Sequence, residues 1–254
     1  MKYFLNYEVV RNNALKLADK IYRKDKFIPD IIYCSMRGGA YMANVISEYF
    51  KIACKDEKPI LFAAVVCHSY TGVASSSSKI VIDGWTYPPE KLKKTDKILL
   101  VDDIYDSGRT LNFLVNLLTE SGLDRNNIKA VVHDYKVFKY KKPLENVPDY
   151  YCRKFEIEKP EDNFWIHYLS HELTGLSKEE LEKYYYSGDS ELKNILEPLF
   201  TKKNCGVYEF IRKENCFCFN FNIDFQFFSF FSNNKSSGRS LGKQAEPCNR
   251  FRRR

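Results

Sequence analysis

Residues 97–110 read Lys-Ile-Leu-Leu-Val-Asp-Asp-Ile-Tyr-Asp-Ser-Gly-Arg-Thr, and this stretch decides the fold. It begins with a short apolar run, which is typical of a buried strand in a parallel sheet. Two adjacent carboxylates, Asp102 and Asp103, end the run. A helix should follow the loop, because apolar residues then recur at helical spacing: Leu111, Leu114, Val115 and Leu118. The stretch therefore predicts a strand, an acidic turn, a hydroxyl-rich loop and a helix.

The loop between the predicted strand and helix is suited to an anion. The first N–H groups of a helix have no internal partner and the helix dipole is positive there, so a phosphate fits. Gly108 allows a close backbone approach, and the hydroxyls of Ser107 and Thr110 add hydrogen bonds. The two aspartates suit sugar hydroxyls, bound directly or through Mg²⁺, since hard cations prefer oxygen ligands. An ordinary strand-to-helix turn is the plainer alternative.

A second strand–loop–helix pattern lies between residues 31 and 50. The apolar run at 31–34 is followed by Ser-Met-Arg-Gly-Gly, and residues 40–50 again have helical spacing. Arg37 places a cation beside the backbone amides of Gly38 and Gly39, which makes a seat for a second anion. The motif is weak by itself, because Arg-Gly-Gly also occurs in plain turns.

Length, composition and charge limit the possible classes of protein. A chain of 254 residues can bury one good core and carry an appendage. No apolar run reaches 18 residues and the N-terminus lacks a signal-peptide apolar region, so we expect a cytoplasmic protein without membrane contact. Cysteines among apolar residues are expected to be reduced core fillers rather than metal ligands: Cys34, Cys54, Cys67 and Cys152.

The net charge of +7 is confined to the C-terminal part of the chain. Residues 202–254 hold 11 Lys and Arg against 4 Asp and Glu, whereas residues 1–201 hold 29 of each. The neutral body has no electrostatic footprint for nucleic acid, so we expect no nucleic-acid partner.

Residues 98–110 resemble the signature with which type I phosphoribosyltransferases bind phosphoribosyl pyrophosphate (PRPP). In that family four hydrophobic residues precede two acids, and Asp-Ser/Thr-Gly-x-Thr follows. Asp106 is the form seen in the 6-oxopurine branch, whose substrates are hypoxanthine, guanine and xanthine. The resemblance implies an α/β fold: a mostly parallel central sheet flanked by helices, with a small hood.

The resemblance stops near residue 200 and so suggests the domain organisation. We expect residues 1–201 to form the phosphoribosyltransferase domain, with a hood built from the N-terminal and 148–200 segments. Residues 202–254 form a tail rich in Phe and Cys that ends in a basic run, and we expect it to be disordered or accessory.

The family pattern implies PRPP contacts from three places. The loop of Arg37, Gly38 and Gly39 matches the one that binds pyrophosphate, often with a non-proline cis peptide just before the first glycine. Ser69 and Tyr70 match a pair that leads a flexible loop closing over PRPP, here residues 71–79. The signature contributes Asp102, Asp103, Asp106, Ser107, Gly108, Arg109 and Thr110.

The same resemblance implies the contacts to the base. Asp106 stands where the family's general base faces purine N7, and Lys136 ends the predicted strand at 128–136, where a cation contacts O6. Lys142 is the alternative, because Lys142-Pro143 matches the family's Lys-Pro dipeptide beyond an apparent insertion at 137–141. We favour Lys136, since a strand end fixes a side chain more firmly than a loop. Trp165 would stack on the base and the backbone near Ile166 would offer polar contacts.

The implied activity is transfer of 5-phosphoribosyl from PRPP to a 6-oxopurine, giving a nucleoside monophosphate and pyrophosphate in purine salvage. The implied cofactor is Mg²⁺, held at Asp102 and Asp103. Glu172 would approach a second Mg²⁺, although it suits a solvent-exposed helix start equally well. Relatives suggest a homodimer or homotetramer. Two alternatives stay open: a non-catalytic sensor of PRPP or nucleotides, and a phosphoribosyltransferase for another base. The preferred 6-oxopurine is also open.

Overall fold

The structure is a computed structural model that describes residues 1–56, 58–70 and 79–202, with only the backbone described at 68–70, 79 and 201–202. The chain divides into two units, Met1–Cys216 and Phe217–Arg254, and every described residue belongs to the first. The predicted flexible loop at 71–79, apart from Lys79, and the tail beyond Lys202 lie outside the described residues.

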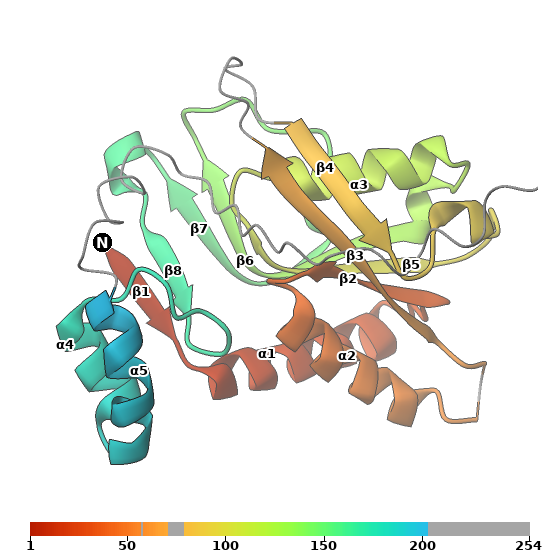
Figure 1. Cartoon of the computed structure of the whole chain (residues 1–254). Coiled ribbons are helices and arrows are strands. Elements are labelled where there is room, and N and C mark those ends of the chain that lie inside the picture. The colour runs from red at the N-terminus through yellow and green to blue at the C-terminus, as the bar shows by residue number, and fades with distance from the viewer. Residues whose placement is uncertain (57, 71–78, 203–254) are drawn as a thin grey trace, which may run out of the picture. The chain divides into compact units, whose positions relative to one another are not determined.

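A mostly parallel sheet forms the centre of the described unit (Figure 1). Neighbouring strands pair in parallel except for the outermost pair, β3 and β4, which is antiparallel. The fold class predicted from the sequence is thereby confirmed. In spatial order the six described strands are β4 (Lys79–Trp85), β3 (Leu61–Tyr70), β2 (Ile31–Met36), β5 (Ile98–Tyr105), β6 (Ile128–Phe138) and β7 (Tyr150–Ile157).

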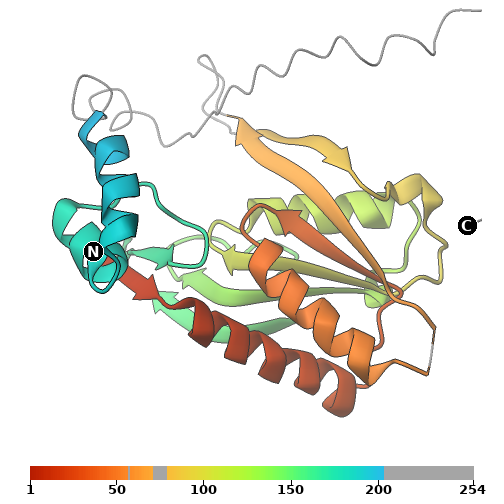
Figure 2. The same cartoon turned by 60° about the horizontal axis from the view of Figure 1, so that its bottom comes forward.

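Helices cover both faces of this sheet (Figures 1 and 2). On one face α1 (Tyr7–Asp19) and α2 (Ala40–Ala53) bury their apolar stripes against β2 and β5. On the other face α3 (Arg109–Glu120) packs against the same two strands together with β3 and β6. The sheet is therefore buried on both sides, which accounts for the uninterrupted apolar run from Ile98 to Val101. A π-helical turn, Lys20–Lys24, prolongs α1.

The sequence pattern predicts that the strand ends at the acidic pair, but β5 continues beyond it. It pairs with β6 as far as Ile104 and Tyr105, so both aspartates belong to the last part of the strand. Parallel pairing, once started by the apolar half, continues through the polar residues because the backbone hydrogen bonds do not depend on side-chain polarity. The carboxylates consequently stand at the carboxyl edge of the sheet, where open α/β sheets bind ligands.

A second, smaller assembly consists of a two-stranded parallel sheet and short helices. Strand β1 (Lys2–Leu5) pairs with β8 (Trp165–Tyr168), although they come from opposite ends of the domain. Helix α4 (Lys178–Leu181) begins with a capping box at Ser177 and Glu180, and after a π-helical turn at Glu182–Tyr186 comes α5 (Ser190–Lys202). We call β1, β8, α4 and α5 the hood.

The predicted boundary of the hood needs one correction. The predicted hood includes residues 150–157, but these residues form β7, the edge strand of the central sheet. The reason is that β7 pairs in parallel with β6 over its whole length, from Tyr150 opposite Val131 to Ile157 opposite Phe138. The segment that reaches the hood begins only after β7.

The cysteines of the described part behave as core residues. Cys34 and Cys54 are buried, Cys67 and Cys152 are partly buried, and none of these four forms a disulfide. Burial raises the pKa of Cys67 to about 11 and those of Cys34 and Cys152 to about 12, so these three stay protonated at neutral pH. No helix within the described ranges is long and apolar enough to cross a membrane.

Candidate active site

The loop after β5 forms a cradle at the start of α3. Gly108 caps the helix with φ of +75° and is buried, and a Cβ there would lie 2.2 Å from the Tyr105 ring. Only glycine fits such a position, and its use is to bring the first amides of the helix close to a ligand. A cavity of about 240 Å³ opens here, and its lining includes both aspartates, Asp106, Ser107, Gly108 and Thr110.

The two aspartates are held differently. Asp102 Oδ1 accepts a hydrogen bond of 3.0 Å from the backbone N–H of Asp103. Burial and, after it, the neighbouring Asp103 carboxylate raise the pKa of Asp102 well above its usual value. Asp103 Oδ2 lies 3.4 Å from Nε2 of His171, a residue that follows the hood strand β8. The acidic pair is thus contacted from the hood as well as from its own strand.

The second glycine loop packs directly against the acidic pair. A Cβ on Gly38 would lie 2.5 Å from both carboxylate oxygens of Asp103, and one on Gly39 would lie 2.5 Å from the carbonyl oxygen of Val101. Both positions need glycine because the loop touches β5 there. The expected cis peptide is present one bond earlier than predicted, between Met36 and Arg37. The Arg37 side chain, which precedes the two glycines, is exposed to solvent.

Asp106 and Lys136 form an ion pair, with Lys136 Nζ 3.0 Å from Asp106 Oδ1. The lysine is almost fully buried and also donates to the backbone oxygen of Phe164 (2.6 Å) and to Asn163 Oδ1 (3.0 Å). Asp106 is half exposed, and among the described residues its Oδ1 accepts no well-aligned hydrogen bond. A carboxylate in this state is available to take a proton from a ligand, while the ammonium faces a carbonyl oxygen.

The ion pair lines a cavity of about 230 Å³. The same cavity is bordered by Arg109 of α3 and by Lys141 and Lys142 of the loop after β6. Lys142 is exposed, whereas Lys136 is fixed by three oxygen atoms. Both lysines considered from the sequence therefore border one cavity, but only Lys136 is preorganised.

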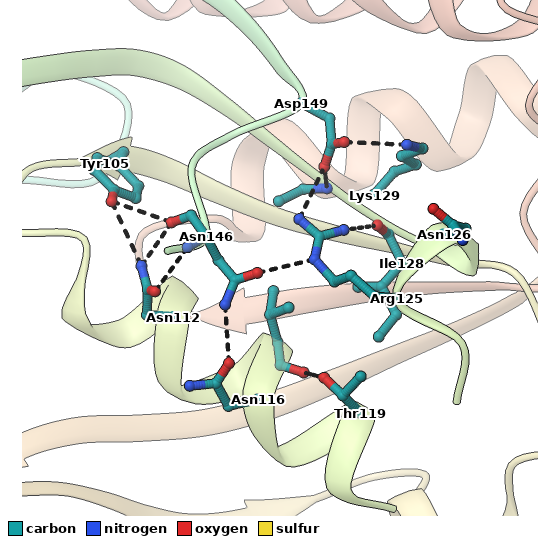
Figure 3. A network of polar contacts seen from close by, with 12 residues as sticks. Tyr105, Asn112, Asn116, Thr119, Arg125, Asn126, Ile128, Lys129, Asn146 and Asp149 are labelled. Atoms are coloured by element: carbon teal, nitrogen blue, oxygen red, sulfur yellow. Dashed lines mark hydrogen bonds and ion pairs between the residues drawn. The ribbon is translucent and has the colours of Figure 1, made fainter. Parts of the chain in front are cut away.

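The loop that carries Lys142 is anchored to α3 through Asn146 (Figure 3). The Asn146 backbone donates to Asn112 Oδ1 (2.9 Å) and accepts from Asn112 Nδ2 (2.6 Å), and its side chain contacts Asn116 (2.9 Å) and Arg125 (2.8 Å). The Tyr105 hydroxyl donates to the same backbone oxygen, at 3.2 Å. The apparent insertion at 137–141 therefore leads into a fixed wall of the cavity.

The predicted base-stacking residue lies beside this arrangement rather than in it. Trp165 is half exposed, and its indole Nε1 donates to Glu172 Oε2 at 3.4 Å. The side chain of Ile166 is buried in the hood core, so only its backbone can meet a ligand. The Lys136 ammonium lies over the ring of Phe164, 5.2 Å from its centroid.

Glu172 is committed to the polypeptide around it. Its Oε2 accepts from the backbone N–H of Tyr168 at 3.1 Å and lies 3.4 Å from His167 Nδ1, in addition to the Trp165 contact. Burial raises the pKa of Glu172 and outweighs these donors. Its Oε2 holds the segment 165–172 together, which differs from the role in metal binding suggested by the sequence.

A family model described as the phosphoribosyl transferase domain matches residues 7–170. The chain belongs to the phosphoribosyltransferase family. A solved purine phosphoribosyltransferase from Pyrococcus horikoshii Ot3 is 24% identical with a TM-score of 0.50, over 70% of this chain and 99% of that one. A hypothetical protein from Neisseria gonorrhoeae with bound ppGpp is 20% identical with a TM-score of 0.52, over 74% and 97%. No curated protein matches the chain.

In this phosphoribosyltransferase the predicted residues fall into two groups. The signature residues, Gly38, Gly39 and Lys136 converge at the carboxyl edge of the sheet. Ser69 and Tyr70 end strand β3, but their side chains lie outside the described residues. Among the residues described, no cluster of three or more His, Cys, Asp or Glu could hold a metal ion.

Several residues of this phosphoribosyltransferase site were not predicted from the sequence. Asn163 and Phe164 receive the Lys136 ammonium, and His171 approaches Asp103. One signal was present: His133 and Asp134 stand inside an apolar strand, and buried ionisable residues require partners. Apart from their contact with each other, those partners come from other elements, Asn13 of α1, Arg153 of β7 and Tyr168 of β8, so the sequence does not show them.

Proposed function

We propose that this phosphoribosyltransferase transfers the 5-phosphoribosyl group of PRPP to a 6-oxopurine base. The observation that carries the proposal is the Asp106–Lys136 ion pair beside the Gly108 cradle. The unit of β5, its loop and α3 supplies a proton acceptor and a phosphate seat. The neighbouring strand β6 supplies a buried cation that can bind a carbonyl oxygen. A 6-oxopurine offers both a ring nitrogen that loses a proton and a carbonyl oxygen.

In the proposed reaction N9 of the purine attacks C1′ of PRPP. The bond from C1′ to the pyrophosphate oxygen breaks, and pyrophosphate leaves with the electron pair. Asp106 takes the proton from the purine at N7 as general base. Lys136 binds the oxygen at C6, and the exposed Trp165 and the backbone at Ile166 are placed to contact the base from the hood.

The geometry of the two glycine loops supports the proposed PRPP seats. The backbone of 107–110, with the hydroxyls of Ser107 and Thr110 and with Arg109 beside them, takes the 5′-phosphate. The Gly38 and Gly39 loop, with the exposed Arg37, takes the pyrophosphate. Ser69 and Tyr70 remain proposed contacts at the end of β3.

The acidic pair would bind the ribose hydroxyls and Mg²⁺. Two adjacent carboxylates at the cavity fit a hard cation whose remaining ligands come from PRPP and water. When bound, the ion neutralises charge on the leaving pyrophosphate. Glu172 is left out of the proposed metal set, since its Oε2 accepts hydrogen bonds from Trp165 and Tyr168.

Three further features belong to the proposal. Salvage of a preformed base is the reaction's proposed place in nucleotide metabolism, and the cytoplasm its proposed location. A homodimer or homotetramer is the proposed assembly. The choice among hypoxanthine, guanine and xanthine stays open.

A nucleotide sensor without transferase activity is the second candidate. Its support is the similarity in fold to the Neisseria gonorrhoeae protein, which was solved with bound ppGpp. The complete set of Asp106, Lys136 and the acidic pair favours catalysis, because a sensor needs only the phosphate seats.

The test is pyrophosphate release from PRPP with Mg²⁺ and, in turn, hypoxanthine, guanine, xanthine, adenine and uracil. We expect turnover with at least one of the first three bases and its loss when EDTA removes Mg²⁺. Turnover only with adenine or uracil would contradict the base assignment. Absence of turnover with all five, together with tight nucleotide binding, would favour the sensor.

The variants Lys136→Gln and Lys142→Gln form a matched pair for the contact to the base. We expect Lys136→Gln to raise KM for the base by about tenfold or more, since a hydrogen bond to a charged group contributes about 1.5–3 kcal/mol. Lys142→Gln should change it by about twofold at most on the same scale. The reverse order would assign the contact to Lys142.

A further inference from the structure

A buried carboxylate outside the reaction centre connects the hood to the central sheet. Asp134 on β6 is fully buried, and Arg153 of β7 donates two hydrogen bonds to it, at 2.6 and 2.8 Å. His133 Nδ1 lies 3.0 Å from Asp134 Oδ2. The Arg153 guanidinium also lies over the ring of Tyr3 in β1, at 4.8 Å. The cluster therefore joins two core strands to the hood.

The hydroxyl of Tyr168, at the end of hood strand β8, completes this cluster. It lies 2.6 Å from Asp134 Oδ2 and 3.1 Å from the backbone oxygen of Asp103. Burial, followed by the nearby Asp103 and Asp134 carboxylates, raises the pKa of Tyr168, so the hydroxyl keeps its proton. One hydroxyl hydrogen serves two acceptors, and the shorter, charge-assisted contact to Asp134 is the stronger.

Tyr168 touches the acidic pair from the hood side. Asp103 belongs to the strand that carries the proposed ribose seat, and β8 also carries Trp165 and Ile166 on the proposed base side. His171 stacks on the Tyr168 ring, with centroids 5.4 Å apart, and its Nε2 faces Asp103 Oδ2. A shift of β8 relative to β5 would therefore change the distance between the two substrates.

We propose that Tyr168 is a positioning residue that sets the distance between the base-binding hood strand and the ribose-binding acidic pair. The proposal rests on the proposed function, because the reaction requires the purine nitrogen and C1′ to be held in contact. A displacement of about 1 Å at the reacting atoms costs about 100-fold in rate. Tyr168 itself touches neither substrate and acts through Asp103 and Asp134.

The cluster allows the hydroxyl to be removed without unpairing the buried charge. In Tyr168→Phe, Asp134 keeps the two hydrogen bonds from Arg153 and the contact with His133. The matched control is Tyr33→Phe. Tyr33 is also fully buried, and its hydroxyl donates a 2.6 Å hydrogen bond to the backbone oxygen of Tyr87, far from the hood.

The experiment compares wild type, Tyr168→Phe and Tyr33→Phe by steady-state kinetics and by hydrogen exchange. We expect Tyr168→Phe to lower kcat by about 10- to 100-fold. Its KM for PRPP should stay within about twofold, because the phosphate and pyrophosphate seats are untouched. Amides of 163–172 should exchange faster in this variant, whereas those of β2, β5 and α3 should not. Tyr33→Phe should show neither effect.

Three results would overturn the proposal. One is an unchanged kcat in Tyr168→Phe, and another is an equal loss in both variants, which would indicate a general loss of stability. The third is an unchanged rate of hydrogen exchange at the amides of 163–172. This measurement tests the proposal even if the wild type turns over no base. If only the proposed function is wrong, the wild type will turn over no base, but Tyr168→Phe will still speed up amide exchange at 163–172.

Discussion

At the scale of single residues, the ion pair between Asp106 and Lys136 separates two tasks of the proposed reaction. The lysine is buried and donates to Asn163 and Phe164, so its position is fixed before any ligand arrives. Its third hydrogen, which faces Asp106, becomes available to a ligand oxygen when Asp106 takes a proton. Asp106 is half exposed and can exchange its partner for a ligand proton. A charge held in place needs no reorganisation during the reaction, which is the main way that preorganised groups lower a barrier.

Asp106→Asn should abolish most turnover and leave PRPP binding largely intact. An amide cannot accept the purine proton, and general base catalysis contributes about 10²- to 10⁴-fold. The measurements are kcat for the active purine and the Kd of PRPP by calorimetry. Asp19→Asn on α1, which removes a surface partner of Arg23, is the control. Activity equal to that of the wild type would remove Asp106 from the role of base.

Asp102→Asn should stabilise the ligand-free protein at pH 8 while weakening PRPP binding. The pKa of Asp102 is raised by burial and by Asp103, so the folded chain binds more protons than the unfolded one between the two pKa values. Its contribution to stability is therefore present at low pH and is lost as the pH rises through the folded pKa. Each kcal/mol recovered should raise Tm by about 2–4 °C.

Thermal unfolding of both proteins at a series of pH values checks this prediction. The difference in Tm should shrink as the pH approaches the unfolded carboxyl value, about 4. A variant less stable than wild type at pH 8 would show that the Asp102 carboxylate is not destabilising.

At the scale of elements, the strand–loop–helix unit around Gly108 is the part most fully predicted from the sequence. Its signals are local: a buried apolar run, a glycine at the loop and apolar residues at helical spacing, and each corresponds to an observed element. The extent of β5 was underestimated, since its last residues are held by β6 rather than by their own polarity. Pairing between strands is a long-range property that a single stretch does not contain.

Gly108→Ala should damage the cradle more than the fold. A Cβ at this position would lie 2.2 Å from the Tyr105 ring, and the backbone there has a positive φ. Either the loop or the ring must shift, and Tyr105 also holds Asn146 of the cavity wall. We expect the Kd of PRPP to rise by about tenfold or more, corresponding to about 1.4 kcal/mol.

The control for this substitution is Gly84→Ala in β4. No atom lies within 4 Å of a Cβ built there, so PRPP binding should not change. Unaltered PRPP binding in Gly108→Ala would mean that the loop amides do not form the phosphate seat.

The hood shows why part of the site could not be predicted. Strand β7 lies within the segment 148–200, which the family resemblance assigned to the hood, and it contains the charged residues Arg153 and Lys154. Arg153 is tolerated because Asp134 of the adjacent strand pairs with it. Likewise the acceptor of Lys136 is a backbone oxygen at Phe164, and no residue type marks such a partner.

At the scale of the whole described unit, the buried Asp134 cluster should make the protein sensitive to acid. Burial by itself raises the pKa of Asp134, but hydrogen bonds from His133, Arg153 and Tyr168 outweigh it and the pKa is lowered. The contribution of this carboxylate is therefore complete above the unfolded value of about 4 and is lost as the pH falls through the lower folded value.

Asp134→Asn tests this sensitivity. The variant should lose about 3–5 kcal/mol at pH 7, because the Arg153 charge is left without its partner. Its stability should also depend less on pH below about 4 than that of the wild type. Urea unfolding at several pH values measures both. If the stability of the variant falls with decreasing pH as much as that of the wild type, another carboxylate is responsible for the acid sensitivity.

The pairing of β1 with β8 also has a consequence for the order of synthesis. Lys2 is made before the central sheet, but its partner Trp165 is made only after the six described strands of that sheet. A growing chain can therefore complete the loop around Gly108 while β1 still lacks its pairing strand β8. The proposed base-binding side closes last, so a released chain that ends shortly before residue 165 should have the loop formed and the hood missing.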